Sequence, residues 1–407
     1  MRKIVKFLKF HFVNQRLMVQ ESLNEISLRG GLGILLLLSA YYLDRDEIGT
    51  YNLASSIAVI ASGLLSGGWI YRITGDGSRK LSINVAIFQI LIISSTVTIL
   101  SNAFVLTMSF SNFSLFLFAL NTLYLNSLCT ALLEVMWAYK KQRDELLIYS
   151  RNKLLITVTV SILFILWFLL NPNIVTIIVL QLSVNVIVLI HNSKLHLNYL
   201  MGFVNLHLFS KFFISTKQWA DSFKLILLSV VSMATFVMDN LFVASKFGIA
   251  RLPEYTIGFA TISLAIGMLG TPLQRILSIS TSDVTNKSFA QRVIAITVLI
   301  CGIMTCLLIC LNQIRNNEIL AEAIKTAFLL FPFAISKIYS MILSIRLGQN
   351  GKLLNVFKSH LIYLGLFAFT FLIFPKWADI ELVACLTSLY NVMSTLYLFK
   401  RYRLELA

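Results

Sequence analysis

The chain has 407 residues, of which 57% are hydrophobic and 13% are charged, a balance too apolar for a soluble globular protein. Apolar runs of membrane-spanning length recur from end to end, which excludes a soluble domain with a single anchor and predicts an all-α polytopic membrane protein. The net charge is +16, but its positive residues lie between the apolar runs, so nucleic acid is not an expected partner.

The chain opens with a basic, amphipathic segment that has neither a long apolar core nor a small-residue cleavage site. We interpret residues 1–20 as a cytoplasmic interfacial helix rather than a signal peptide. Two apolar runs follow within residues 27–69, joined by an acidic turn at 44–47. Each run has about 20 residues, enough to cross a hydrocarbon core of roughly 30 Å as a helix.

The second of these runs carries a polar stripe, with a small polar residue at nearly every third or fourth position. Its members are Asn52, Ser55, Ser56, Ser62 and Ser66. Unsatisfied polar groups are costly in hydrocarbon, so this face should point into the protein or into a wet cavity. We expect Asn52 and Ser55 to line such a cavity; ordinary packing of small residues between helices is the alternative.

Further apolar runs bring the expected number of spans to about twelve. They lie near residues 81–106, 112–139, 154–170, 174–192, 222–245, 255–275, 293–312, 320–345, 359–374 and 380–399. The longest segment between spans divides the chain into halves of similar size. We therefore expect a first bundle of six helices over 21–200, a cytoplasmic surface linker over 201–221 and a second six-helix bundle over 222–407.

The distribution of positive charge predicts the orientation of these spans. With the N-terminus in the cytoplasm, 26 of the 34 Lys and Arg residues fall in cytoplasmic segments and five fall in outer loops. This asymmetry follows the positive-inside rule and places both termini in the cytoplasm. The two halves then share an orientation. Residues 48–61 also align loosely with 254–267, pairing Thr50 with Thr256 and Ala54 with Ala260, which predicts a parallel internal repeat.

Three cations fall within the expected spans and are candidates for substrate binding. Arg29 lies beside glycines in the first span, although it could instead snorkel to the cytoplasmic interface. Lys337 lies five residues after Pro332, where we expect a helix kink, and we expect it to line the cavity. Lys325 is a third candidate, but an ion pair with Glu322 near the outer rim is the simpler interpretation.

Two carboxylates within the spans are candidates for ion coupling. Asp239 in the seventh span and Glu134 in the fourth could carry a proton or a sodium ion. Either could instead be a structural counter-ion, Asp239 for Lys246. No metal or other cofactor is expected: the cysteine pair one helical turn apart in the ninth span has neither His nor carboxylate nearby.

Two stretches resemble a known family. An arginine early in the first span, an acidic turn and then IGTYNLAS at 48–55 are similar to the opening of Wzx-type O-antigen flippases. The stretch VMDNLFVASKFGIARLPEYTIGFAT at 237–261 looks like the second-half counterpart. These proteins belong to the superfamily that also contains MATE drug exporters and lipid II flippases.

The resemblance implies two six-helix bundles in a V shape around a central cavity, in the bacterial inner membrane. It also implies transport of undecaprenyl-pyrophosphate-linked repeat units for O-antigen, and so lipopolysaccharide, to the periplasmic leaflet. Membrane lipid and a polysaccharide polymerase are then expected partners. In such a cleft, Arg29 and Lys337 would lower the barrier to a pyrophosphate while the polyprenyl tail stays in lipid.

Two other functions fit parts of the sequence. A membrane-embedded O-antigen polymerase or glycosyltransferase would have similar length, but should carry a large outer loop with catalytic residues, whereas the outer loops here are short. A cation-coupled multidrug exporter of the same superfamily should favour acidic cavity residues, whereas this chain offers Arg and Lys. We therefore predict a transporter rather than an enzyme.

Overall fold

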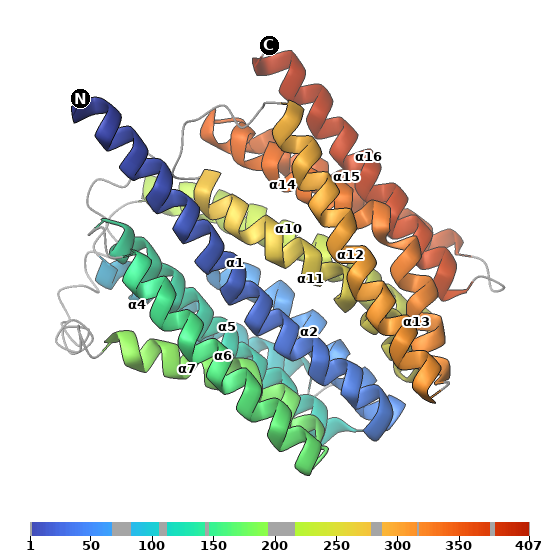
Figure 1. Cartoon of the computed structure of the whole chain (residues 1–407). Coiled ribbons are helices and arrows are strands. Elements are labelled where there is room, and N and C mark those ends of the chain that lie inside the picture. Colours follow the sequence, from blue (N-terminus) through green and yellow to red (C-terminus); the bar gives the residue numbers. More distant parts are fainter. Residues whose placement is uncertain are drawn as a thin grey trace.

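A computed structural model describes residues 2–66, 83–105, 112–142, 146–193, 216–277, 287–315, 317–374 and 379–406. These residues are almost entirely helical, and no strand occurs among them. Figure 1 shows two groups of long helices, one from each half of the chain, and places the beginning of α1 and the end of α16 at the same end of the molecule.

Of the helices in the described residues, six come from the first half of the chain. They are α1 (Arg2–Tyr42), α2 (Arg45–Ser66), α4 (Ile83–Val105), α5 (Phe113–Gln142), α6 (Leu146–Leu170) and α7 (Ile174–Ser193). The second half supplies a short 3₁₀ turn and seven helices. They are α10 (Thr216–Phe247), η2 (Ile249–Arg251), α11 (Leu252–Leu277), α12 (Lys287–Arg315), α13 (Glu318–Leu329), α14 (Phe331–Gln349), α15 (Leu353–Ile373) and α16 (Ile380–Leu406).

The number of long helices confirms the predicted polytopic fold. In the described residues, nine helices are long and apolar enough to cross a membrane, and the bent pair α13–α14 makes a tenth. The helices α2 and α4 are not among these candidates; with them, and with α13–α14 taken as one, the described helices number twelve, as expected. The bend between α13 and α14 is 49° and lies beside Pro332, in the first turn of α14, which confirms the predicted kink.

Two predicted boundaries are not tested by the fold. The helix α1 runs from Arg2 to Tyr42 without a break, so the predicted interfacial helix is continuous with the first span. Most of the predicted linker over 201–221 lies outside the described residues, and α10 begins at Thr216.

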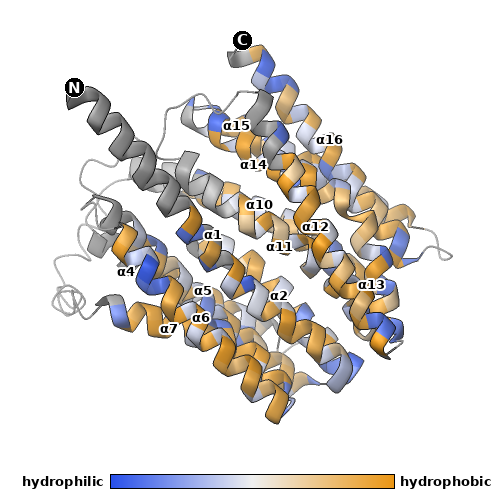
Figure 2. Cartoon of the chain, in the orientation of Figure 1, coloured by the Kyte–Doolittle hydropathy of each residue, from blue (hydrophilic) through white to orange (hydrophobic). Residues whose placement is uncertain are grey.

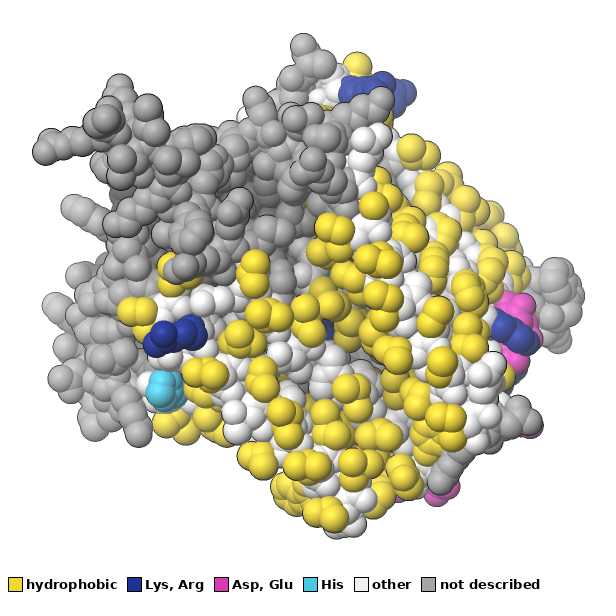
Figure 3. Space-filling model, viewed as in Figure 1, with side chains coloured by type: hydrophobic (Ala, Val, Ile, Leu, Met, Phe, Trp, Pro, Cys, Tyr) yellow, Lys and Arg dark blue, Asp and Glu magenta, His cyan; other side chains and the backbone are white. Residues whose placement is uncertain are grey.

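The surface between the two ends of the helices is apolar. Figure 2 shows hydrophobic residues along the helices, and the face in Figure 3 is covered mainly by hydrophobic side chains, with acidic side chains gathered near one end. Large exposed side chains include Leu170, 87% exposed, and Leu372, 82% exposed. So much exposed apolar surface fits lipid contact and supports a multi-pass membrane protein.

The two halves pack against each other through α1 on α11 and α2 on α10. A Cβ atom on Gly63 of α2 would lie 3.0 Å from the carbonyl oxygen of Ser229, and one on Gly49 would lie 2.1 Å from that of Ile249. Both glycines therefore allow close approach of backbones from opposite halves, as small residues do between membrane helices.

A third glycine allows the same kind of close approach within the second half. A Cβ atom on Gly258 of α11 would lie 2.6 Å from the carbonyl oxygen of Ala323 in α13. We expect Gly258→Ala to lower the free energy of unfolding by about 1–3 kcal/mol through overpacking, measured as a lower melting temperature in detergent. Gly302→Ala, whose Cβ would meet nothing within 4 Å, is the control; equal melting temperatures would contradict this account.

Candidate functional site

The interior of the second-half helices holds buried ionisable side chains. Asp239 of α10 is 1% exposed, Lys337 of α14 is 3% exposed and His360 of α15 is 7% exposed. Tyr255 of α11 is also buried beside them. Because ionisable groups at membrane depth are expensive, each needs a specific partner or a function.

The Asp239 carboxylate is held by neutral donors. It accepts a hydrogen bond of 2.5 Å from the Tyr255 hydroxyl and one of 2.9 Å from the backbone N–H of Asn240. The same tyrosine hydroxyl lies 3.1 Å from the hydroxyl of Thr387 in α16. Three helices therefore meet at this carboxylate.

The Lys337 ammonium is also held by neutral groups. It donates a hydrogen bond of 2.9 Å to Thr235 Oγ1 and lies 3.8 Å from the centroid of the Phe236 ring. Thr235 precedes Asp239 by one turn of α10, so both face the same way. The opposite charges of Asp239 and Lys337 attract each other across this turn.

Hydroxyl and amide side chains join the helices around Lys337. Asn391 of α16 donates to Ser336 Oγ at 2.6 Å, and Thr395 donates to the Ser336 carbonyl at 3.1 Å. The hydroxyls of Ser359 in α15 and Ser394 in α16 lie 2.8 Å apart. These bonds fix α14, α15 and α16, and so fix the direction from which Lys337 reaches Thr235.

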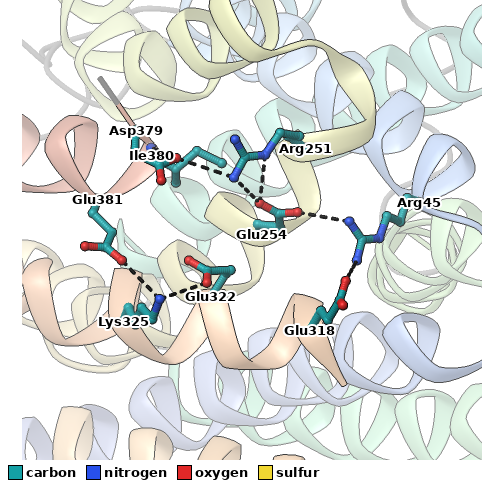
Figure 4. Close-up of polar contacts among 9 residues, drawn as sticks. All are labelled: Arg45, Arg251, Glu254, Glu318, Glu322, Lys325, Asp379, Ile380 and Glu381. Atoms are coloured by element: carbon teal, nitrogen blue, oxygen red, sulfur yellow. Dashed lines mark hydrogen bonds and ion pairs between the residues drawn. The ribbon is translucent and has the colours of Figure 1, made fainter. Parts of the chain in front are cut away.

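A second group of charges lies where α11 and α13 begin, and we call it the rim network (Figure 4). Its members are Arg45, Arg251, Glu254, Glu318, Glu322, Lys325, Asp379 and Glu381. Arg45, from the first half, lies 3.1 Å from Glu254 and 3.0 Å from Glu318, both from the second half. Arg251 lies 3.1 Å from Glu254 and 3.4 Å from Asp379. Arg45 therefore joins the two halves.

Lys325 belongs to the rim network. Its ammonium lies 2.9 Å from Glu322 and 3.2 Å from Glu381, and its side chain is 53% exposed (Figure 4). The ion pair with Glu322, expected from the three-residue spacing, is present. All three residues belong to the second half of the chain.

Hydrogen bonds between uncharged groups also cross between the halves. Asn52 of α2 donates to the hydroxyl of Thr256 in α11, and Asn240 of α10 donates to Ser56 Oγ at 3.2 Å. Nearer the rim, Tyr41 donates to the Leu311 carbonyl at 2.7 Å. Asn52 and Ser56 of the polar stripe on α2 therefore face the other half of the protein.

Arg29 lies on the seam between α1 and α11. Its side chain is half-buried and runs along α11 at Gly267. One turn further along α1, Gly33 faces Leu264 of α11. Here the seam leaves a small hollow with room for no more than about one water molecule, lined by Gly33, Leu36, Leu37, Ile257, Ala260, Thr261, Leu264 and Met304.

Two predicted site residues remain. Ser55 and Glu134 are half-buried on α2 and α5. The alternative pairing of Asp239 with Lys246 is wrong: Lys246 lies 4.2 Å from the centroid of the Phe371 ring, while Tyr255 holds Asp239. Lys337 likewise packs among second-half helices, whereas Arg29 lies on the seam.

Several residues of the site were not predicted as such. Tyr255, Thr387 and Thr235 are ordinary residues of apolar helices, and nothing in their local sequence marks them as partners of a charge. His360 carried a signal, since an ionisable side chain in an apolar run is a functional candidate.

Solved structures share this fold. The chain is similar to a MOP superfamily transporter from Pyrococcus furiosus, described by the reverse polarity of its binding pocket, with a TM-score of 0.61 and 14% identity over 96% of this chain and 94% of that one. It is also similar to a multidrug resistance MATE family transporter of that superfamily in an outward-facing conformation, with a TM-score of 0.62 and 14% identity over 96% and 94% of the two chains.

A third similar structure is the lipid II flippase MurJ in an inward closed conformation, with a TM-score of 0.60 and 14% identity over 95% of this chain and 87% of that one. No protein-family model and no curated protein matches the sequence. At these identities the likeness shows the fold alone, which the chain shares with these three transporters along almost its whole length.

The buried charges lead to a prediction about stability. We expect Asp239→Asn or Lys337→Met alone to lower the free energy of unfolding by about 1–3 kcal/mol, because each disturbs a buried hydrogen bond and removes an attraction to the opposite charge. The double variant should recover most of this loss. Melting temperatures of the purified proteins check it; a double variant no more stable than either single one would show that the two charges do not compensate each other.

The rim network leads to a prediction about local opening. We expect Arg45→Gln to speed amide hydrogen exchange at the start of α2 and in η2 by roughly two- to fivefold, since partly exposed ion pairs contribute about 0.2–1 kcal/mol each. Lys325→Gln is the matched control, because it removes rim ion pairs that do not cross between the halves. The same acceleration in both variants would argue against a specific role for Arg45.

Proposed function

We propose that this chain is a flippase that moves polyprenyl-pyrophosphate-linked oligosaccharide repeat units from the cytoplasmic to the periplasmic leaflet of a bacterial inner membrane. The observation that carries the proposal is Arg29, a cation held within the first candidate span on the seam between the halves of a transporter fold. Undecaprenyl-linked O-antigen units are the substrate that the sequence resemblance favours.

The chemistry of the substrate explains the need for a buried cation. A pyrophosphate carries at least two negative charges, and arginine binds phosphate oxygens through two parallel hydrogen bonds. The polyprenyl tail can stay in lipid against the exposed apolar side chains of the helices. The fold similarity to a lipid II flippase supports a lipid-linked substrate, and a cationic seam favours it over an organic cation.

Transport in this proposal proceeds by alternating access. The rim network, together with the bonds of Asn52 and Tyr41, closes the outer end of the seam while the halves part at the cytoplasmic end. Rocking of one half against the other then breaks the contacts of Arg45 and opens the outer end. Both chain ends stay in the cytoplasm.

We propose that the residue that couples transport to an ion lies in the second half. Asp239, held by Tyr255 and facing Lys337 across one turn of α10, is the proposed carrier of a proton or sodium ion. Lys337 then acts on the substrate indirectly, through the charge of Asp239. Glu134 remains the alternative carrier, in the first half.

The transport step breaks no covalent bond, so the proposal includes no catalytic residue and no cofactor. A polysaccharide polymerase would use the exported unit and is the proposed downstream partner. A chain that was itself the polymerase would act on the unit after it has crossed the membrane, and this difference provides the test.

Deletion of the gene tests the proposal. We expect single lipid-linked repeat units to accumulate on the cytoplasmic leaflet, as judged by their protection from periplasmic sugar-cleaving enzymes in intact spheroplasts. Arg29→Gln should fail to restore export at normal membrane levels, whereas Arg151→Gln, which changes an exposed arginine on α6, should restore it. Accumulation of exported but unpolymerised units would instead identify a polymerase.

A further inference from the structure

We infer that Gly267 of α11 is a positioning residue that directs the guanidinium of Arg29, so that the anion site is assembled from both halves of the protein. The positioning of Arg29 by Gly267 is inferred from the geometry of the seam between α1 and α11. The link to pyrophosphate affinity rests on the proposed function.

The end of the Arg29 side chain lies in the space that a side chain at residue 267 would fill. A Cβ atom built on Gly267 would lie 2.3 Å from both Cδ and Nε of Arg29 and 2.6 Å from its Cζ. These distances are far inside ordinary contact, since carbon atoms pack at about 3.5–4.0 Å. The end of the arginine side chain therefore lies in a notch that exists only because residue 267 has no side chain.

Neither close packing of two backbones nor the backbone conformation requires glycine at residue 267. At Gly49, Gly63 and Gly258 the nearest atoms to a Cβ are backbone atoms of another helix or of η2, so a methyl group there would force elements apart. At Gly267 the nearest atoms belong to the end of a long side chain, which can rotate away. Among the described glycines, positive φ occurs at Gly248 and Gly351, so residue 267 does not need glycine for its backbone.

Because of the notch, the orientation of the Arg29 side chain depends on the position of one half relative to the other. Arg29 belongs to α1 of the first half and Gly267 to α11 of the second. The same two helices also touch one turn further along, where Gly33 faces Leu264. While α1 and α11 pack, the notch holds the guanidinium in one direction. When the halves part, the notch moves away with α11, and the arginine is released.

A binding experiment on the purified full-length protein tests this inference. The probe is farnesyl pyrophosphate, with farnesol as its uncharged counterpart. We expect Gly267→Ala to weaken binding of the pyrophosphate about tenfold, which corresponds to about 1.4 kcal/mol, without lowering the melting temperature. Arg29→Ala should weaken binding at least as much, and the double variant should match Arg29→Ala. Gly302→Ala, in open space on α12, should bind like the unmodified protein.

The outcomes separate this inference from the proposed function. If Gly267→Ala binds as the unmodified protein does while Arg29→Ala loses affinity, the positioning role is overturned and the proposed function stands. A further loss from Gly267→Ala in the Arg29→Ala background would mean that the glycine acts through its own packing, which also overturns the inference. If Arg29→Ala leaves binding of farnesyl pyrophosphate unchanged, both the inference and the role of Arg29 in the proposed function fail.

Discussion

A polar group in the hydrocarbon layer must find its partner inside the protein, and this requirement shapes the whole structure. The outer surface is left to apolar side chains, while hydroxyls and amides turn inward. The stripe on α2 meets the second half through Asn52 with Thr256 and Ser56 with Asn240. The contact between the halves is therefore partly a matter of hydrogen bonding, which can be exchanged for water when the halves part.

The same requirement explains the hydrogen bonds around the buried charges of the second half. Asp239 and Lys337 bring opposite charges into one interior, yet each is held by neutral partners on other helices. Replacing the water shell of two ions takes many fixed dipoles, and Tyr255, Thr387 and Thr235 supply some of them. A second half ordered in this way can move against the first as a unit, which alternating access requires.

The sequence predicted local features well and distant partners poorly. The spans, the kink beside Pro332 and the Glu322–Lys325 pair follow from run length, proline chemistry and helical spacing, all of which act within a few residues. Periodicity does not say which helix will face a given side chain, so the contacts of Lys337 with Thr235 and Phe236 of α10 could not be predicted. Gly267 could not be found at all, because Arg29, which gives that glycine its meaning, lies in the other half of the chain.

The rim network has a consequence for the surroundings of the protein. Arg45 is shared by two carboxylates and Glu254 by two arginines, so the halves are joined by a row of alternating charges rather than by one bond. Several of these side chains are partly open to solvent. Salt weakens ion pairs that are partly open to solvent, so in the proposed orientation the salinity outside the cell would affect how firmly the rim network holds the halves together. Moving the cell between dilute and salty media would then change the fraction of molecules in which the rim network is intact, with no change in sequence.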